Sequence, residues 1–293
     1  MAIKEGKEYY TAAQTKQILG ITDGMLYNYI DNGALERIIP PGKKQGVYKR
    51  GEVDQLAREL QSFIIHRKTK PTKFMRVTTR QEMVECQEIS QALFGVGRTT
   101  VDERMKLLEK NPITYHLLKN EDQIIGYAAM MPLKPGRLEK VLKQTIPVSI
   151  EAEDIEEPRE GSSIDLYLHA IGIRPGFSTV EKHTYGSRLV AELITQIVEL
   201  GKQGITIGTI AARSNMPDGI RLMKHAGFTE IEPLTPERRT FVIEVKESGI
   251  PFAKQYKDAL RQWQEAHKTD SRDHKRQRTT THNSKQPTLS TKA

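Results

Sequence analysis

The chain has 293 residues, enough for two domains, and its 37% hydrophobic and 28% charged residues give it the composition of a soluble globular protein. It holds no apolar run long enough to cross a bilayer, and its first residues, MAIKEGKEYY, lack the apolar core of a signal peptide. The single cysteine, Cys86, excludes an intramolecular disulfide framework and a cysteine-rich zinc site. We therefore expect a cytoplasmic protein that binds neither a metal nor a membrane.

The net charge of +8 is concentrated at the two ends of the chain. Residues 1–73 hold 13 Lys and Arg against 8 Asp and Glu, and residues 268–293 hold 7 against 2. Residues 74–267, in contrast, hold 25 against 27. Basic segments attract polyanions through their summed field. This distribution predicts nucleic acid binding at the ends, with duplex DNA as the partner, and a different task in the centre.

Two short helices are predicted near the N-terminus. Thr11 and Gln14 form the pattern of a capping box, and the helix that they begin ends at Gly20. Thr22 caps a second helix, which runs over 23–32. Two short helices joined by a glycine-containing turn form a helix-turn-helix, whose second helix presents its outer face to the major groove. The apolar residues that face the core from this helix are Leu26, Tyr29 and Ile30.

The next segment predicts a hairpin wing and a third helix. Two β-like segments flank a basic tip at 41–44, and a helix over 51–65 follows. The pattern from Ile21 to Leu35, with Tyr48-x-Arg50-x-Glu52-Val53 after it, resembles the winged helix-turn-helix of the MerR/excisionase-like group. That resemblance implies a DNA-binding domain over 1–66 and a nucleoid-associated protein; a helical domain that binds another protein is the alternative. The residues expected to contact DNA are Gly24, Tyr27, Asn28, Lys43, Lys44, Lys49 and Arg50.

A basic, proline-containing segment, 67–73, is expected to link this module to a second domain over 74–247. Alternating and helical patterns in the first half of that domain predict strands and helices in mixed order. The strands are expected at 74–78, 114–119 and 123–132, and the helices at 81–94 and 99–110. The acidic insertion over 150–161 is either a solvated loop or a lip that attracts a cationic amine.

The stretch over 163–201 predicts a strand followed by a helix. Residues 164–173 are rich in β-branched and apolar side chains, and Pro175 ends the strand because it lacks an N–H for the ladder. A polar loop follows, and Tyr185-Gly186 is expected to open a helix with apolar residues at helical spacing. A glycine at the mouth of a helix leaves backbone N–H groups free for a phosphate.

This stretch resembles the acyl-CoA-binding segment of the GNAT superfamily of N-acyltransferases, with Ile173-Arg174-Pro175 as the end of the strand and 183–188 as the diphosphate loop. The run from Asn215 to Gly227-Phe228 is similar to the late motif of that superfamily. The resemblance implies an α+β fold, a mixed β-sheet flanked by helices, that uses acetyl-CoA as a cosubstrate. The cofactor-binding residues that it implies are Ile171, Ile173, His183, Tyr185, Gly186, Ser187, Arg188 and Asn215.

Acyl transfer from a thioester to an amine needs a base. Asp165, Tyr167 and His169 alternate onto one face of the central strand, and His169 is the best base among them because it titrates near neutrality. Tyr167 with a bound water is the second candidate. Met223 occupies the position of the family's tyrosine acid and cannot give a proton. The expected function is N-acetylation of an unidentified amine by a DNA-binding enzyme. The alternative is a transcription regulator that senses acyl-CoA without catalysis.

The C-terminal region divides into an amphipathic helix and a polar tail. Large apolar residues recur at helical spacing between 252 and 267. We assign the segment that contains this helix to 248–267. This helix either caps the fold or forms the contact face of a homodimer. Residues 268–293 have almost no large apolar side chains, and a disordered basic tail is expected there.

Overall fold

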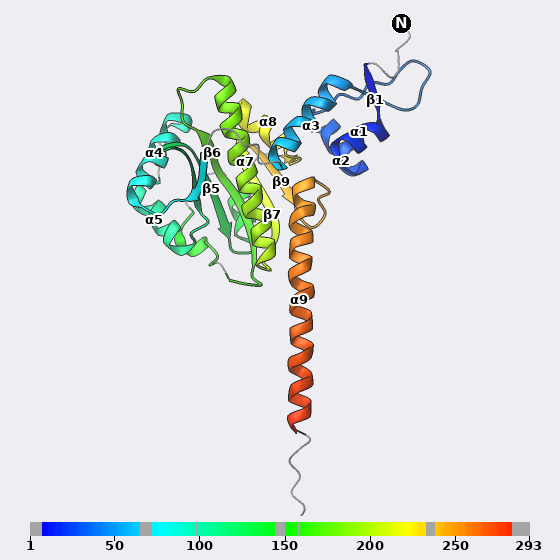
Figure 1. The fold of residues 1–293 in the computed structure, drawn as a ribbon. Helices are drawn as coiled ribbons and strands as arrows, with labels where there is room; N and C mark the ends of the chain where they lie inside the picture. The colour runs from blue at the N-terminus through cyan, green and yellow to red at the C-terminus, as the bar shows by residue number, and fades with distance from the viewer. Residues whose placement is uncertain are drawn as a thin grey trace, which may run out of the picture.

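The computed structural model describes residues 8–64, 72–95, 97, 99–143, 150–157, 159–232 and 238–282, and within these ranges it describes no side chains for 61–64 and 268–282. Residues 67–71 of the predicted linker, 67–73, and the end of the tail, 283–293, lie outside these residues, whereas 72 and 73 belong to the first strand of the larger part. The described chain forms a two-stranded sheet near the N-terminus and a seven-stranded mixed sheet in the larger part (Figure 1). The mixed sheet flanked by helices that the sequence predicts is therefore present.

The N-terminal module contains three helices and a small sheet. In chain order its elements are β1 (Tyr9–Thr11), α1 (Ala12–Leu19), α2 (Asp23–Asp31), β2 (Val47–Lys49) and α3 (Arg50–Ile64). Thr11 caps α1 with the predicted capping box, and Thr22 accepts a hydrogen bond from the N–H of Met25 at the start of α2. The predicted wing is only partly present. Its two sides meet in one bridge, between Ile38 and Val47, and β2 pairs instead with β1.

The larger part is built around one sheet in the order β3-β4-β5-β6-β7-β9-β8. Neighbouring strands are antiparallel except β6 and β7, which are parallel. Its strands are β3 (Thr72–Arg76), β4 (Tyr115–Asn120), β5 (Gln123–Leu133), β6 (Ser163–Ile173), β7 (Thr206–Ser214), β8 (Thr229–Ile231) and β9 (Arg239–Glu244). Its helices are α4 (Arg80–Phe94), α5 (Val101–Lys110), α6 (Arg137–Lys143), η1 (Ala152–Asp154), α7 (Thr179–Lys202), α8 (Pro217–His225) and α9 (Pro251–His282).

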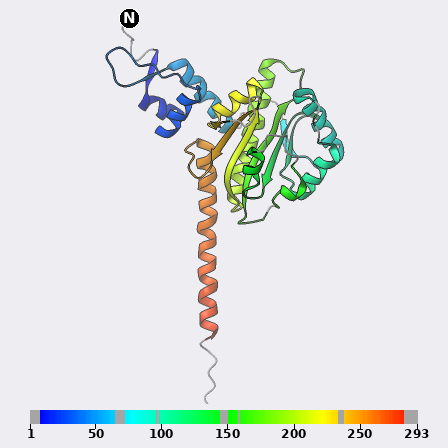
Figure 2. The same cartoon turned by 180° about the vertical axis from the view of Figure 1, so that it is seen from behind.

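Helices cover both faces of this sheet (Figures 1 and 2). One core joins α4, α5 and α6 to the face that carries Tyr127 and Tyr167, and another joins α7 and α9 to the opposite face. Tyr256 of α9 fixes that helix to the sheet, because its hydroxyl donates to the carbonyl of Ile205 and accepts from the N–H of Ile207. Helix α9 therefore caps the fold, one of its two predicted roles.

The prediction of a disordered tail from residue 268 is wrong for its first part. Helix α9 continues to His282 and projects away from the rest of the molecule (Figure 1). Lys, Arg and Gln, which are frequent between 268 and 282, have high helix propensity, and a helix already nucleated on α7 can extend through them. Low apolar content indicates that this segment has no core to join, but it does not exclude a helix.

The N-terminal module and the larger part share one hydrophobic core. Leu26 and Tyr29 of α2 pack in the same cluster as Phe228 and Ile250. Gly227 lies at this contact with φ +84°, and a Cβ there would come within 2.8 Å of Met25 Cε. The two predicted domains are consequently in close contact, with α2 against the turn that follows α8.

Candidate functional site

The central strand β6 is paired on both sides over only part of its length. Its pairing with β7 ends at Leu168 opposite Ala212, after which β7 continues beside β9 alone. Its pairing with β5 continues to Ile173. The register with β5 shifts between Ala129 and Met130, which leaves His169 as the extra residue of a β-bulge. The sheet therefore opens between β6 and β7 from His169 onward, as bulges next to active sites often allow.

The open edge of β6 exposes backbone polar groups. The N–H of Arg174 donates to the carbonyl of Ile125, which makes these two residues a hydrogen-bonded pair of the β5–β6 ladder. Hydrogen-bonding directions alternate along an antiparallel strand, so the N–H and C=O groups of Ile171 and Ile173 face the gap towards β7. No backbone segment of the described residues pairs with them. An extended amide-containing ligand could add to this edge as a strand does.

His169 and Tyr167 lie together at the gap. Their rings meet edge to face with centroids 5.7 Å apart, as the prediction of a shared face requires. His169 reaches solvent, whereas Tyr167 is buried. Desolvation, followed by the positive charges of Arg104 and Arg238, lowers the pKa of His169 to about 4. With its pKa lowered, the ring is neutral at neutral pH and can accept a proton.

Asp165, the third residue of the predicted face, has a structural role. Its carboxylate accepts a hydrogen bond from the N–H of Thr209 at 3.0 Å, where the register between β6 and β7 is irregular. Gly172 lets α4 pack close to the strand, because a Cβ there would lie 2.2 Å from Leu93 Cδ1.

The predicted diphosphate loop is part of a helix. Helix α7 begins at Thr179, capped by Ser178, whose hydroxyl accepts from the N–H of Glu181 while the Glu181 carboxylate accepts from the N–H of Ser178. The expected loop up to Tyr185-Gly186 is therefore wrong. The physical reason is this Ser-x-x-Glu capping box, which was overlooked and which starts a helix that nothing interrupts before Gly186.

The residues expected around the diphosphate lie along the first turns of α7. His183 is exposed, whereas Tyr185 is buried and packs edge to face on Phe177. Gly186 and Ser187 are half-buried inside the helix, and Arg188 pairs with Glu192 at 2.5 Å. A helical N–H at these positions is already bonded within the helix, so only exposed side chains such as His183 are available to a phosphate.

The late motif lies at the far side of the gap. Asn215 is exposed between β7 and α8, next to the open end of β7. Met223 is buried in the core of α8, in agreement with the expectation that it gives no proton. The ring of His225, at the end of α8, contacts the carboxylate of Glu59 of α3. The motif thus shapes the gap and connects it to the N-terminal module.

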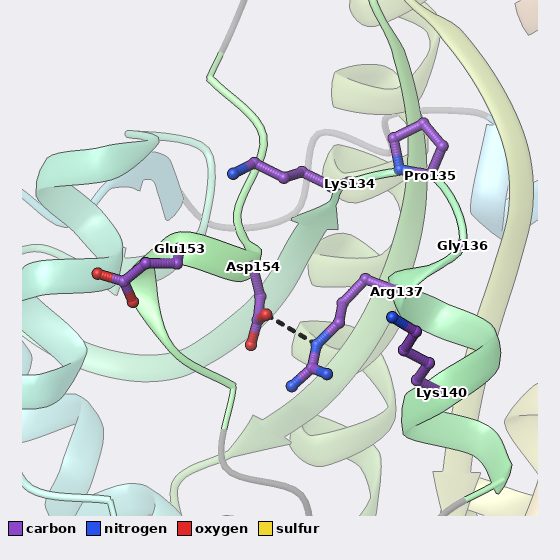
Figure 3. Close-up of a pocket in the computed structure, with 7 residues that line it drawn as sticks. All are labelled: Lys134, Pro135, Gly136, Arg137, Lys140, Glu153 and Asp154. Atoms are coloured by element: carbon purple, nitrogen blue, oxygen red, sulfur yellow. Dashed lines mark ion pairs between the residues drawn. The ribbon is translucent and has the colours of Figure 1, made fainter.

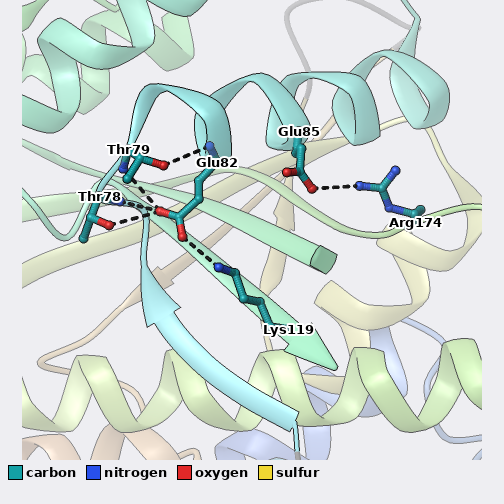
Figure 4. Close-up of polar contacts among 6 residues, drawn as sticks. All are labelled: Thr78, Thr79, Glu82, Glu85, Lys119 and Arg174. Carbon is teal, nitrogen blue, oxygen red and sulfur yellow. Dashed lines mark hydrogen bonds and ion pairs between the residues drawn. The ribbon is translucent and has the colours of Figure 1, made fainter. Parts of the chain in front are cut away.

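A polar network fixes the start of α4 near the end of β6 (Figure 4). Burial opposes ionisation of Glu82, but the hydrogen bonds from Lys119 and from the backbone of Thr78 and Thr79 lower its pKa to about 2. One turn further along α4, Glu85 faces Arg174 at 3.7 Å. These contacts hold α4 against the face of β5 and β6.

A cavity of about 290 Å³ lies at the opposite end of β6 (Figure 3). Its lining residues are Lys134, Pro135, Gly136, Arg137, Lys140, Glu153 and Asp154. Arg137 pairs with Asp154 at 2.8 Å, and Lys110 pairs with Glu157 at 2.5 Å. Two carboxylates of the acidic insertion, those of Asp154 and Glu157, are therefore already paired with basic neighbours.

The residues predicted to contact DNA have different environments. Gly24 and Tyr27 on α2 are exposed, and so are Lys43 and Lys44 at the tip of the wing. Asn28 was expected to face the major groove, but its amide donates to the carbonyl of Gly227 at 3.2 Å. This placement corrects the prediction, because α2 packs on the larger domain.

The two remaining basic residues of the wing have partners within the module. Lys49 is ion-paired with Glu36 and, at 3.2 Å, with Glu52. The guanidinium of Arg50 lies over the ring of Tyr10, 4.6 Å from its centroid. Lys43 and Lys44 are the more exposed of these four basic residues.

Sequence reasoning missed the arginines beside His169. Arg104 of α5 and Arg238 act on the pKa of His169, and Arg213 is the residue of β7 that follows the last pair with β6. Only Arg104 left a signal in the sequence. It occupies the apolar stripe of its helix together with Val101 and Leu108, where a charged residue needs a reason.

Other site chemistries find no support in the described residues. Cys86 is buried, and burial raises its pKa to about 12, so its thiol is not poised as a nucleophile. Within the described ranges no cluster of His, Cys, Asp or Glu could hold a metal ion. Nor is any helix of these ranges long and apolar enough to span a membrane.

No family model and no curated protein matches the chain. Solved structures that it is similar to include an N-acetyltransferase from Staphylococcus aureus, with 12% identity and a TM-score of 0.39 over 60% of this chain and 99% of that one. An alanine N-acetyltransferase of a ribosomal protein from Escherichia coli has 14% identity and a TM-score of 0.36 over 58% and 90%. The NatC complex bound to Gag peptide and CoA has 11% sequence identity and a TM-score of 0.40, over 60% of this chain and 99% of that one. Likeness at this level is remote, and the function has to be inferred from the site itself.

Proposed function

We propose that this chain is an acetyl-CoA-dependent N-acetyltransferase in which the acetyl group is transferred between β6 and β7, beside His169. The observation that carries the proposal is the one-sided pairing of β6 beyond Leu168. Unpaired strand edges are normally covered, because they attract other chains. An edge left open inside a sheet, next to a neutral histidine, suits a ligand that carries amide groups.

The residues of the gap fit the pantetheine arm of acetyl-CoA better than they fit its diphosphate. The N–H and C=O groups of Ile171 and Ile173 can pair with the amide groups of pantetheine as they would with an added strand. For the diphosphate, the side chains of Lys182 and His183 are exposed on the first turn of α7. Gly186, Ser187 and Arg188, proposed from the sequence, could take part only if that turn rearranges, since their backbone lies within a helix.

His169 is proposed as the general base. Acetyl-CoA supplies an activated thioester when it is bound. The neutral ring of His169 accepts a proton from the acceptor nitrogen as the new C–N bond forms. A backbone N–H on the gap side of β6, such as that of Ile171, can stabilise negative charge on the carbonyl oxygen. Tyr167 positions the imidazole through their edge-to-face contact. Because Met223 cannot donate a proton, the thiolate leaves and is protonated by water.

The substitution His169→Gln tests this role in the full-length chain. We expect kcat to fall by about 10²-fold or more, the usual scale for loss of a positioned base, while acetyl-CoA still raises Tm. The pKa of His169 is lowered, so its basic form is present at neutral pH and is lost as the pH falls through the lowered pKa. The acid limb of the pH–rate profile should therefore lie below the ordinary histidine range and should vanish in the variant.

His267→Gln is the matched control, because His267 stacks on Trp263 in α9, far along the chain from the gap. It should leave both rate and profile unchanged. An unaltered rate in His169→Gln would remove His169 from the mechanism and leave Tyr167 with a bound water as the base. Acetyl-CoA binding without release of CoA thiol, with any amine, would instead support a regulator that senses acyl-CoA.

We also propose that the N-terminal module binds duplex DNA, as its net positive charge and its resemblance to winged helix-turn-helix domains suggest. In this arrangement the wing is the available contact, since α2 is partly covered. Replacing Lys43 and Lys44 with Ala should weaken binding to all sequences and reduce the slope of log affinity against log salt by up to about two, one unit for each phosphate contact. A slope that does not change would exclude this surface.

A further inference from the structure

A guanidinium group without a carboxylate partner lies beside the proposed transfer centre. Arg104 of α5 is 7% exposed, and its Nη2 donates to Ser90 Oγ at 3.4 Å. No carboxylate in the described part of the chain lies within 4.0 Å of it. Other shielded arginines do have such partners, as in the pair of Arg188 with Glu192. A buried cation with no counter-ion is costly, so Arg104 requires an explanation.

The surroundings of Arg104 place it between α5 and the sheet, near the bulge of β6. Burial is the main influence on the pKa of Tyr115, Tyr127 and His169, and in each case the charge of Arg104 lowers the pKa. These residues come from β4, β5 and β6. The Tyr127 hydroxyl is sealed from solvent, and Ser90 and Arg104 are both close enough to lower its pKa. Arg104 keeps 7% of its surface exposed, so it is shielded from water but not fully sealed.

The charges that act on His169 and Tyr167 have one sign. Arg104 and Arg238 act on His169, and Arg213 and Arg238 act on Tyr167, with no carboxylate among these influences. Two of these arginines have few competing contacts: Arg104 bonds to Ser90, and Arg213 donates to the carbonyl of Leu142. An acceptor that is only cationic, such as a polyamine, would be repelled here. An acceptor with a carboxylate would be attracted and would neutralise the buried charge.

We propose that the acceptor is an amine that also bears a carboxylate close to its amino group, as an α-amino acid does, and that Arg104 binds this carboxylate. The inference rests on the proposed function, because it concerns the second substrate of the same site. A guanidinium pairs with a carboxylate through parallel hydrogen bonds, which fix orientation as well as position. When Arg104 of α5 holds the carboxylate, the amino group of the acceptor is directed to His169 of β6.

The test compares acceptors that differ only in this group. A panel of common α-amino acids and the corresponding α-carboxamides is offered to the full-length chain with acetyl-CoA, and release of the CoA thiol is measured. We expect kcat/KM for the best acid to exceed that for its carboxamide by about 10²-fold, the scale of a charge-assisted pair in a shielded site. In Arg104→Gln this preference should fall to nearly one, and Arg104→Lys should keep part of it because the charge remains.

Arg239→Gln is the control, since Arg239 pairs with Glu230 at another part of the sheet and should not affect the preference. If Arg104→Gln lowers the rate of acid and carboxamide by the same factor, Arg104 serves the chemistry of transfer and the proposal is wrong. Equal use of carboxamides by the unaltered protein, or a preference for polyamines, would also overturn it, whether or not the variants fold. Loss of the proposed function itself would be recognised separately, as failure of acetyl-CoA to raise Tm.

Discussion

Two sets of backbone groups in this molecule lie at the ends of regular structure and are treated in opposite ways. At the end of α8 the carbonyls of Lys224, His225 and Gly227 accept hydrogen bonds from side chains of α2. On the upper part of β6 the groups of Ile171 and Ile173 face a gap and have no partner among the described residues. In both sets the backbone groups lose their regular partners, because a helix ends in one case and strand pairing ends in the other.

The difference indicates which surface is structural and which is free to bind. The last carbonyls of a helix have no partner inside the helix, and leaving them unpaired in a contact would be costly. The amides of Asn28 and Asn32 and the hydroxyl of Tyr29 satisfy them, so the contact of α2 with α8 is a built interface. The edge of β6 reaches solvent and tolerates the lack of partners until a ligand arrives.

The largest effect is expected from a substitution that disturbs the contact between α2 and the end of α8. Gly227→Ala would place a Cβ within 2.6 Å of Ile250 Cγ2 at φ +84°. Strain and overpacking together should lower the free energy of unfolding by about 2–4 kcal/mol. Gly20→Ala is the matched control, because Gly20 has φ +66° with nothing within 4 Å of the added Cβ, and should cost about 1 kcal/mol. Chemical denaturation measures both, and equal losses would mean that the α2–α8 contact contributes nothing.

A buried unpaired group offers a second, smaller effect. Both ring nitrogens of His116 lack hydrogen-bond partners, and its ring stacks on Phe74. Burial, and then Arg76, lowers the pKa of His116 to about 3. The unfolded chain binds a proton near pH 6.5, so stability from this group is present above that pH and is lost as the pH falls towards 3, by about 2 kcal/mol at pH 5.

His116→Leu should remove this acid sensitivity while leaving stability at pH 7 equal or higher, since no hydrogen bond is lost. Tm measured from pH 7 to pH 4 in both proteins provides the comparison. If the variant loses stability with acid as steeply as the unaltered chain does, another group is responsible for the proton uptake.

The open edge itself is best examined by amide hydrogen exchange, which should show the smallest but most local effect. The N–H groups of Ile171 and Ile173 should exchange faster than that of Gly172, which by alternation faces β5. Acetyl-CoA should slow the first two and leave Gly172 nearly unchanged. Slow exchange at Ile171 and Ile173 in the free protein would show that the edge is already covered.

Sequence reasoning succeeded where local chemistry determines structure. The caps Thr11 and Thr22 start α1 and α2 as predicted, because each hydroxyl satisfies a helix-end N–H close to it in sequence. The same rule places the start of α7 at Ser178, whose capping box with Glu181 is a local signal as clear as that of Thr11. A glycine inside a helix, such as Gly186, does not mark its start when a cap precedes it.

The features of the site that were missed depend on contacts between distant parts of the chain. Nothing local reveals that the amide of Asn28 meets Gly227, or that pairing of β6 with β7 stops at Leu168. The position of His169 beside Tyr167 could be predicted from strand alternation, but the bulge that makes His169 the extra residue follows from register with β5. The sequence thus indicates which groups are chemically capable, and the fold decides which of them are available.

The contact between α2 and α8 also bears on how the chain is made. Tyr29 and His225, which it joins, are 196 residues apart in sequence. At a synthesis rate of 5–20 residues per second, the apolar face of α2 waits roughly 10–40 s for its partner to leave the ribosome. During that interval the newly made N-terminal module presents Met25 and Tyr29 without the surface that buries them. Nascent chains on the same messenger RNA could associate through this exposed apolar face. A chain released before residue 225 is made would keep the face exposed and would be prone to aggregate.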